Sequence, residues 1–176
     1  ESNNMVKSIL FIGDSNTAAN FSYADQLKKL YPGIRIKKIA QNGANTTWMK
    51  QQLENEIKSN KYDVVSILGG SNDIYGGMSL DTTKSNLNSM YNLLKTNGIK
   101  VLAISPPNKN FYENKTEDKQ KKLTDLVSWL KANSNKDYFI DFHSITNDKA
   151  LFSKGDGYLH PQAKAHTILL NDAKQK

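Results

Sequence analysis

Short apolar runs recur along the chain, and each of them ends in small or polar residues. They are rich in β-branched side chains and lie at Ile9–Ile12, Ile34–Ile39, Val64–Leu68, Val101–Ile104 and Tyr138–Ile140. Continuous apolar runs of this length are typical of strands that are buried on both faces of a parallel sheet. The pattern therefore predicts five buried strands.

Between these runs, apolar residues recur at the spacing of one helix face. The four groups are Ala24, Leu27 and Leu30; Met49, Leu53 and Ile57; Leu87, Met90, Tyr91 and Leu94; and Leu123, Leu126, Val127 and Leu130. A fifth group follows Pro161, which suits the first turn of a helix because an N–H has no helical partner there. Its members are Ala165, Ile168, Leu169 and Ala173.

Strands and helices thus alternate, which predicts βαβ connectivity. Asn97 and Gly98 close the third helix directly before the next strand, where the chain needs a residue in the left-handed conformation. Parallel strands joined in this way carry helices on both faces of the sheet. We therefore expect an α/β fold with a five-stranded parallel sheet between two helical layers. The pattern does not determine the strand order.

The chain has 176 residues, which suits one domain. We expect that domain to span residues 5–176, with residues 1–4 a tag or linker remnant or the edge of a longer protein. The absence of cysteine excludes disulfides, thiolate metal sites and cysteine nucleophiles. No apolar run approaches the ~20 residues of a membrane span, and Ile9–Ile12 is too short for a signal sequence. Both a cytoplasmic protein and a domain excised from a secreted one remain open.

The net charge of +7 would suit an anionic partner such as nucleic acid. The lysines are scattered, however, and their densest run, Lys119-Gln-Lys-Lys122, falls on the exposed face of a predicted helix. A solvated surface explains this pattern better than a nucleic-acid interface. We expect no nucleic-acid partner, and the oligomeric state is not indicated.

In parallel α/β sheets, ligands bind beside the loops that leave the carboxyl ends of the strands. Those loops are rich in small polar residues. They are Gly13-Asp14-Ser15-Asn16-Thr17, residues 40–46, residues 69–77, residues 105–108 and Gly155-Asp156-Gly157-Tyr158-Leu159-His160-Pro161.

These loops contain the groups that acyl transfer requires, namely a hydroxyl nucleophile, a base and donors for the oxyanion. Ser15 lies where a strand turns into a helix, so its hydroxyl and its N–H are available. Gly43 offers a backbone N–H that no side chain screens, and Asn72 offers an amide donor. His160 is the candidate base, because imidazole titrates near neutral pH.

The same residues resemble a known family. Gly13-Asp14-Ser15, Gly43, Gly70-Ser71-Asn72-Asp73 and Asp156…His160-Pro161 resemble, in order, the four signature blocks of the SGNH (GDSL-like) serine hydrolases. The resemblance runs from Ile9 to His166. It implies a flavodoxin-like, three-layer α/β/α fold and the use of Ser, Gly, Asn and His in the roles given above. We expect no cofactor and no metal.

One position departs from the pattern of the family. There the orienting aspartate usually precedes the histidine by three residues, a position that Gly157 occupies here. Asp156 would have to reach the ring from one residue further back. We favour Asp156 as the orienting group, with a backbone carbonyl and a Ser-His dyad as the alternative.

Each residue also has a purely structural interpretation. Asp14 or Ser15 could cap the first helix, and Gly43 could simply permit a tight turn. Asn72 or Asp73 could organise a turn through the backbone, and His160 could stand at a helix start. The convergence of complementary groups at one edge of the sheet favours the catalytic interpretation.

The chain has two further histidines besides His160. His166 lies on the last predicted helix, where we expect it to pack against the sheet. His143 follows the strand that ends before Asp141-Phe142, and it is the alternative candidate for the base.

Other classes of function are open to the same fold. The loop after the first strand also resembles the phosphate loop of a flavodoxin, which would make the protein a flavin or nucleotide module. That reading leaves His160 without a role. A non-catalytic glycan-binding domain is a third possibility. A magnesium site formed by Asp14, Asp73 and Asp156 lacks the expected spacing.

The predicted function is hydrolysis of a carboxylic ester through an acyl-enzyme. Asn42, Asn45, Asn108 and Tyr75 are expected near the mouth of the site. These polar side chains favour a short acyl group on a sugar, and therefore O-deacetylation of a carbohydrate. Lysophospholipase or thioesterase activity is the next alternative.

Overall fold

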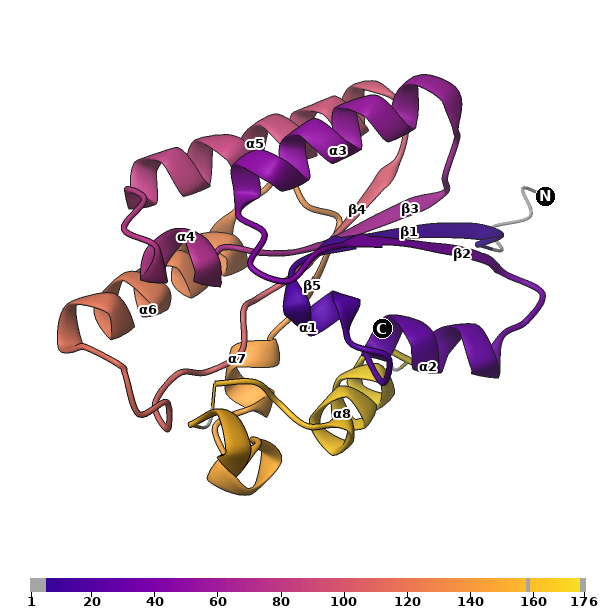
Figure 1. Cartoon of the computed structure of the whole chain (residues 1–176). Helices are drawn as coiled ribbons and strands as arrows, with labels where there is room; N and C mark the ends of the chain where they lie inside the picture. Colours follow the sequence, from indigo (N-terminus) through magenta and orange to yellow (C-terminus); the bar gives the residue numbers. More distant parts are fainter. Residues whose placement is uncertain (1–5, 158, 175–176) are drawn as a thin grey trace.

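The computed structural model describes residues 6–157 and 159–174, with side chains up to residue 168. Its centre is a five-stranded sheet with the order β2-β1-β3-β4-β5, in which every neighbouring pair is parallel (Figure 1). The strands are β1 (Ser8–Gly13), β2 (Arg35–Ala40), β3 (Val64–Leu68), β4 (Lys100–Ile104) and β5 (Tyr138–Ile140). All five strands predicted from the apolar runs are present. The expectation that each is buried is wrong for β2, which has no buried residue, and for β5, in which only Ile140 is buried, because these two strands form the edges of the sheet.

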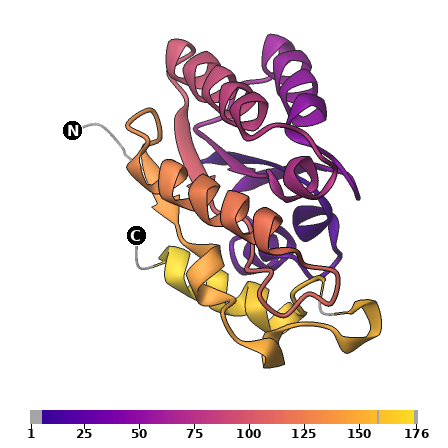
Figure 2. The ribbon, with the colours of Figure 1, turned by 90° about the vertical axis from the view of Figure 1, so that its left-hand side faces the viewer.

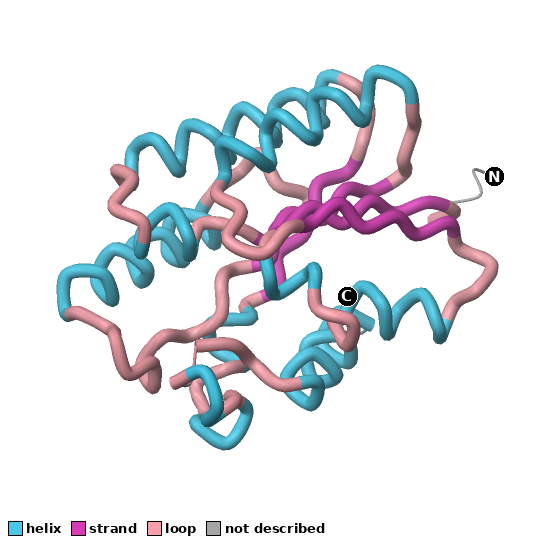
Figure 3. Tube along the Cα trace, in the orientation of Figure 1, coloured by secondary structure: helices cyan, strands magenta, loops and turns pink. Residues whose placement is uncertain are grey.

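The strand order places a topological switch between β1 and β3. The chain runs outward from β1 to β2 and then returns to the other side of β1. In the register of the sheet, Gly13 at the end of β1 is level with Ala40 of β2 and Leu68 of β3. The loops that follow these three strands, pink in Figure 3, consequently leave the sheet side by side. A crevice at this point is the usual ligand site of doubly wound sheets.

The five helices expected from the apolar spacing are present. They are α2 (Tyr23–Leu30), α3 (Thr46–Ser59), α5 (Leu80–Thr96), α6 (Glu117–Ala132) and α8 (Ala163–Lys174). Asn97 caps α5 and Gly98 has φ +70°, as the sequence predicts. Pro161 lies outside α8, which begins two residues later at Ala163. Instead, Pro161 forms an isolated antiparallel bridge with Phe152.

Short helical segments complete the chain. They are α1 (Ser15–Ala18), α4 (Ser71–Tyr75), α7 (Phe142–Ile145) and two 3₁₀ turns, η1 (Lys149–Leu151) and η2 (Lys154–Asp156). The sequence pattern did not reveal them because each is at most five residues long. So short a segment has no helical periodicity to detect.

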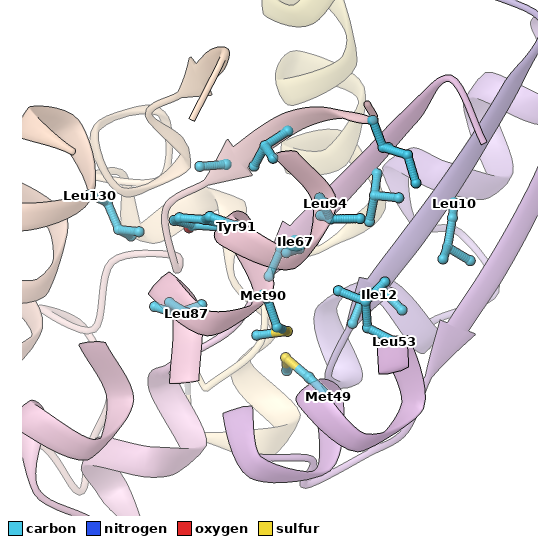
Figure 4. Packing of buried hydrophobic residues seen from close by; sticks show 14 of the residues in the cluster. Leu10, Ile12, Met49, Leu53, Ile67, Leu87, Met90, Tyr91, Leu94 and Leu130 are labelled. Carbon is cyan, nitrogen blue, oxygen red and sulfur yellow. The ribbon is translucent and has the colours of Figure 1, made fainter. Parts of the chain in front are cut away.

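The core consists of two apolar layers, one on each face of the sheet. On one face, α3, α5 and α6 pack against Leu10, Ile12 and Ile67 (Figure 4). On the other face, α2, α7 and α8 cover Phe11 and Leu68. Residues next to each other in a strand thus point into different layers, as the pleat requires. Figure 2 shows the resulting three-layer arrangement from the side.

Over residues 6–157 and 159–174, none of the helices is long and apolar enough to cross a membrane.

Candidate active site

The hydroxyl of Ser15 lies beside the imidazole of His160 at the carboxyl edge of the sheet. Ser15 Oγ is 2.9 Å from His160 Nε2, although the two residues are 145 positions apart in the chain. Ser15 is the first residue of α1, directly after β1, whereas His160 comes from the connection that leads into α8. The distance is that of a good hydrogen bond between a hydroxyl and a ring nitrogen. The fold therefore brings the predicted nucleophile and the predicted base together.

The second ring nitrogen of His160 contacts a carboxylate. His160 Nδ1 lies 2.9 Å from Asp156 Oδ2, and Asp156 Oδ1 accepts the backbone N–H of Leu159 at 3.1 Å. The turn η2 ends at Asp156, and Gly157 follows with φ +68° in the left-handed region. The loop from Asp156 to His160 is one residue longer than is usual in the family, and this turn accommodates the extra residue. Asp156 can therefore still reach the imidazole ring. Asp156 rather than a backbone carbonyl thus contacts Nδ1.

Asp14 caps the short helix that carries Ser15. Its Oδ1 accepts the backbone N–H of Asn16 at 2.9 Å and the side-chain amide of Asn16 at 3.0 Å. Asp14 is buried, and burial raises the pKa of its carboxyl group above the usual value, against the opposing effects of its hydrogen bonds and of Lys109. Capping is therefore the role of Asp14, while the neighbouring hydroxyl of Ser15 remains free to contact His160.

Three residues that line one pocket, Ser15, Gly43 and Asn72, each carry an available N–H donor. The N–H groups of Ser15 and Gly43 have no hydrogen-bond partner within the described part of the chain. Gly43 has φ +76°, a conformation that glycine adopts without strain. The Asn72 amide donates one N–H to the carbonyl of Ala44 at 2.9 Å, which fixes its plane and leaves its other N–H available. Gly43 and Asn72 both line the pocket beside Ser15.

Asp73 has a structural role that the sequence indicated only in part. It is 1% exposed and accepts hydrogen bonds from the backbone and the hydroxyl of Thr46 and from the hydroxyl of Thr83. These contacts tie α4 to the start of α3 and to α5. Asp73 thereby holds α4 in place, and with it Asn72, which lines the pocket.

The pocket next to Ser15 has a volume of about 690 Å³. Its lining includes Asn42, Gly43 and Asn72 together with residues of the 153–163 connection and of the α1–α2 loop. Phe21 of the α1–α2 loop is among these lining residues, and it is 44% exposed. A volume of this size suits a small ligand or one residue of a polymer. Nothing in the hydrophobic pattern distinguished Phe21 from a core residue.

The two other histidines have different surroundings. His166 is buried, accepts the backbone N–H of Tyr23 on Nδ1 at 3.1 Å and stacks on the Tyr23 ring. Burial lowers the pKa of His166 to about 4, although Asp25 opposes the shift. His143 lies on α7, where burial also lowers its pKa, and it is not among the residues that line the pocket. The geometry therefore favours His160 over His143 as the base.

Not all of the polar residues expected at the mouth are found there. Asn42 lines the pocket, but Asn45, Asn108 and Tyr75 do not. Asn45 caps α3 by accepting the N–H of Trp48, and Asn108 is 2% exposed. The expectation for these three residues is therefore wrong, because Asn45 caps a helix, Asn108 is buried and the Tyr75 ring packs against that of Tyr112.

The carboxylates do not form a metal site in the described part of the chain. Over the residues that the structure describes, no three His, Cys, Asp or Glu side chains gather as a metal site would require. Asp73 in particular is engaged by Thr46 and Thr83.

Comparison with known proteins identifies a family for the chain. A model of the GDSL-like lipase/acylhydrolase family matches residues 11–168, which include Ser15, Gly43, Asn72, Asp156 and His160. No curated protein sequence matches the chain.

Solved structures with the same three-layer α/β/α fold are similar over almost the entire chain. A member of the lipolytic protein G-D-S-L family from Veillonella parvula has a TM-score of 0.81 at 17% identity, covering 96% of each chain. An acetylxylan esterase from Geobacillus stearothermophilus has a TM-score of 0.80 at 21% identity, covering 96% of this chain and 93% of the other. The esterase EstA from Pseudoalteromonas, inhibited by monoethylphosphonate, has a TM-score of 0.76 at 18% identity, covering 96% and 95%.

Proposed function

The chain belongs to the GDSL-like lipase/acylhydrolase family and hydrolyses ester bonds, and from that premise we propose that Ser15, His160 and Asp156 form its catalytic triad. The observation that carries the proposal is the pair of 2.9 Å contacts that joins the Ser15 hydroxyl to His160 and His160 to Asp156. In the tautomer that fits these contacts, Nδ1–H donates to the carboxylate and Nε2 accepts from the hydroxyl.

The first half of the reaction forms an acyl-enzyme. Ser15 Oγ attacks the ester carbonyl carbon while its proton passes to Nε2 of His160. The carbonyl oxygen becomes an oxyanion, which accepts hydrogen bonds from the N–H groups of Ser15 and Gly43 and from the Asn72 amide. The ester C–O bond then breaks, and the alcohol leaves with the proton that His160 had taken.

The second half releases the acid. Water attacks the acyl carbon, and its proton passes to Nε2 of His160 while the same three donors hold the oxyanion. The bond to Ser15 Oγ breaks, and His160 returns the proton to that oxygen. The carboxylic acid leaves, and the enzyme is regenerated without a cofactor or a metal.

The substrate that we propose is a short acyl group, such as acetyl, on a sugar. Phe21 presents an exposed ring at the rim of the pocket, and the C–H face of a sugar can stack on such a ring. Asn42 and Gln162 supply amide groups to the same lining, and they could bind sugar hydroxyls. The similarity to an acetylxylan esterase supports this substrate class.

The nucleophile is tested with Ser15→Ala. This variant should lose at least about 10⁴-fold in kcat on p-nitrophenyl acetate, because triad residues act as a unit. A fluorophosphonate should label wild-type Ser15 and leave the variant unmodified, while both proteins melt at similar temperatures. A Ser15→Ala protein that keeps most of its activity would disprove the assignment, and wild-type protein without labelling would indicate a non-catalytic binding domain.

The substrate class is tested with Phe21→Ala. On an acetylated xylo-oligosaccharide, this variant should raise KM by roughly tenfold, which corresponds to the loss of one aromatic contact. On methyl acetate, which has no sugar to stack on the ring, its kinetics should match the wild type. Tyr31→Ala is the matched control, because Tyr31 is 42% exposed but does not line the pocket.

The length of the acyl chain is a separate test. A series of p-nitrophenyl esters should show the highest kcat/KM for acetate, with a fall as the chain grows. Preference for long chains would contradict the sugar ester and favour a lysophospholipase or thioesterase. In that case the aliphatic side chains of the pocket, Ala19, Leu159, Pro161 and Ala163, would hold the acyl chain.

A further inference from the structure

Lys109 is a buried cation that the reaction described above does not use. It follows β4 in the 105–116 connection, and only 4% of its surface is exposed. Lysine is rarely buried to this degree, because its ammonium group loses hydration that other groups must replace. The partners of this ammonium group therefore indicate what the residue does.

The ammonium group of Lys109 donates a hydrogen bond to the loop that carries His160. Lys109 Nζ donates to the carbonyl oxygen of Leu159 at 3.0 Å. This carbonyl belongs to the peptide unit directly before His160. On the other side of the histidine, the carbonyl of His160 accepts the N–H of Ser153 at 3.1 Å. The backbone is thus held on both sides of the imidazole.

The 105–116 connection holds the same loop at a second point. The backbone N–H of Glu113 donates to the carbonyl of Gly157 at 3.0 Å. Gly157 is the left-handed residue that brings Asp156 within reach of His160. Contacts of this connection therefore flank both partners of the His160–Asp156 pair.

The charge of Lys109 is balanced by carboxylates of the site. Asp14, from the turn between β1 and α1, and Asp156, from η2, both act on it electrostatically and favour its charged form. The rings of Tyr75 and Tyr112 lie 6.0 and 5.8 Å from Nζ and present their electron-rich faces. The ammonium group thus lies close to the residue that precedes Ser15 and to the residue that orients His160.

We propose that Lys109 is a positioning residue for the base, which fixes the peptide unit before His160 and supplies positive charge near Asp14 and Asp156. It touches neither substrate nor the reacting atoms. Its effect reaches the reaction through the orientation of the imidazole, where a displacement of 1 Å can cost on the order of 10²-fold in rate. The proposal rests on the roles of Ser15 and His160 proposed above.

The surroundings of Lys109 give this role a pH dependence. Burial lowers the pKa of Lys109 to about 8, against the opposing effect of Asp14 and Asp156. The positive charge is present at neutral pH and is lost as pH rises through this value. Of the facing groups, Tyr75 stays neutral over that range because burial raises its pKa to about 12. We therefore expect kcat/KM to fall above pH 8, since kcat/KM reports on groups of the free enzyme.

The test compares Lys109→Met with Lys119→Met. Lys119 is a suitable control because its Nζ lies 5.3 Å from the same Tyr75 ring and donates to the Tyr75 carbonyl, away from the His160 loop. Lys109→Met should lower kcat on p-nitrophenyl acetate by between about tenfold and 10²-fold, with KM changed less than about threefold. Its alkaline fall in kcat/KM should disappear. Lys119→Met should retain both the rate and the pH profile of the wild type.

A conservative variant distinguishes the effect of losing the positive charge from the effect of disturbing the fold. Lys109→Arg keeps a charge that is not lost in the accessible pH range, so it should recover part of the rate and remain active at pH 9.5. The inference is wrong if Lys109→Met keeps the wild-type kcat, or if it loses rate and thermal stability together while retaining the alkaline fall. Should Lys109→Met not fold, a wild-type profile that stays level from pH 7 to 9.5 overturns the inference by itself.

Ser15→Ala, measured in the same assay, distinguishes the two proposals. If Ser15→Ala is inactive and Lys109→Met is unaffected, the inference for Lys109 alone fails. If Ser15→Ala is active, the assignment of the nucleophile fails, and the role of Lys109 fails with it.

Discussion

The carboxylate of Asp156 lies 2.9 Å from Nδ1 of His160, although the two residues are four positions apart in the chain. A spacing of three is the usual one in the family that the sequence resembles, so the additional residue has to be taken up by the loop. The 3₁₀ turn η2 and the left-handed Gly157 accomplish this. The contact favours a Ser-His-Asp triad over a dyad in which a backbone carbonyl orients the ring.

Asp156→Asn should lower kcat on p-nitrophenyl acetate by at least about 10²-fold, because the asparagine amide no longer selects the tautomer with Nδ1–H. Asp148→Asn is the matched control. Asp148 belongs to the same segment and caps η1 by accepting the N–H of Ala150 at 3.0 Å. A loss below tenfold for Asp156→Asn would support the dyad instead.

Asn72→Ala should reduce kcat by roughly 10²–10³-fold, the usual cost of one oxyanion donor. KM should change little, because the hydrogen bond strengthens only as the oxyanion forms. Asn42→Ala provides a comparison, since Asn42 lines the same pocket and has no assigned part in the oxyanion site. Steady-state kinetics of the two variants would decide the point, and equal losses in kcat would contradict the role of Asn72.

Gly43→Ala should destabilise the protein by about 1–2 kcal/mol, because an alanine is strained at φ +76°. No heavy atom within 4 Å would touch the new Cβ, so the cost comes from the backbone and not from a clash. Gly33→Ala is the control, because its Cβ also meets nothing within 4 Å and Gly33 is not among the glycines with positive φ. Denaturant titration should show destabilisation for Gly43→Ala and none for Gly33→Ala.

The long elements of the fold were predictable because burial determines them. An apolar run such as Val64–Leu68 is buried along its whole length, and the four α5 residues that carried the helix prediction, Leu87, Met90, Tyr91 and Leu94, are all buried. The strand order was not predictable, since it depends on crossovers that leave no local pattern. The sequence placed Pro161 in the first turn of α8, but the helix begins two residues later at Ala163. Pro161 is extended instead, because it pairs with Phe152 in an isolated β-bridge.

The residues proposed for the chemistry were predictable for a different reason. Ser15, Gly43 and Asn72 follow the ends of β1, β2 and β3, and parallel strands bring those ends together. Asp156 and His160 lie further along the chain, beyond α7, and were predicted from their residue types and from the resemblance to the family.

The burial of Lys109 and of Asn108 was not predicted, because a polar side chain in a loop suggests exposure, whereas both are at most 4% exposed here. Neither the burial of a lysine nor the exposure of Phe21 leaves a signal in one sequence. Both follow from how the 105–116 connection and the α1–α2 loop pack.

His166 gives the fold a predictable dependence on pH. Its pKa is lowered from 6.5 to about 4, mainly by burial, so the folded protein holds it neutral. Protonation would also remove the lone pair that accepts the N–H of Tyr23. Between pH 6.5 and 4 the unfolded chain therefore binds more protons at this site than the folded protein. The stability linked to His166 is complete above pH 6.5 and is lost as pH falls towards 4.

The size of this effect follows from the difference in pKa and is on the order of 3 kcal/mol once both forms are fully protonated. The measurement is the free energy of unfolding at pH 7 and pH 4.5, for the wild type and for His166→Gln, whose amide can still accept from Tyr23. Groups such as Asp14 titrate in both proteins, so their contributions cancel in the comparison. The wild type should lose more stability than His166→Gln on acidification. Equal losses would mean that His166 is protonated in the folded protein as readily as in the unfolded chain.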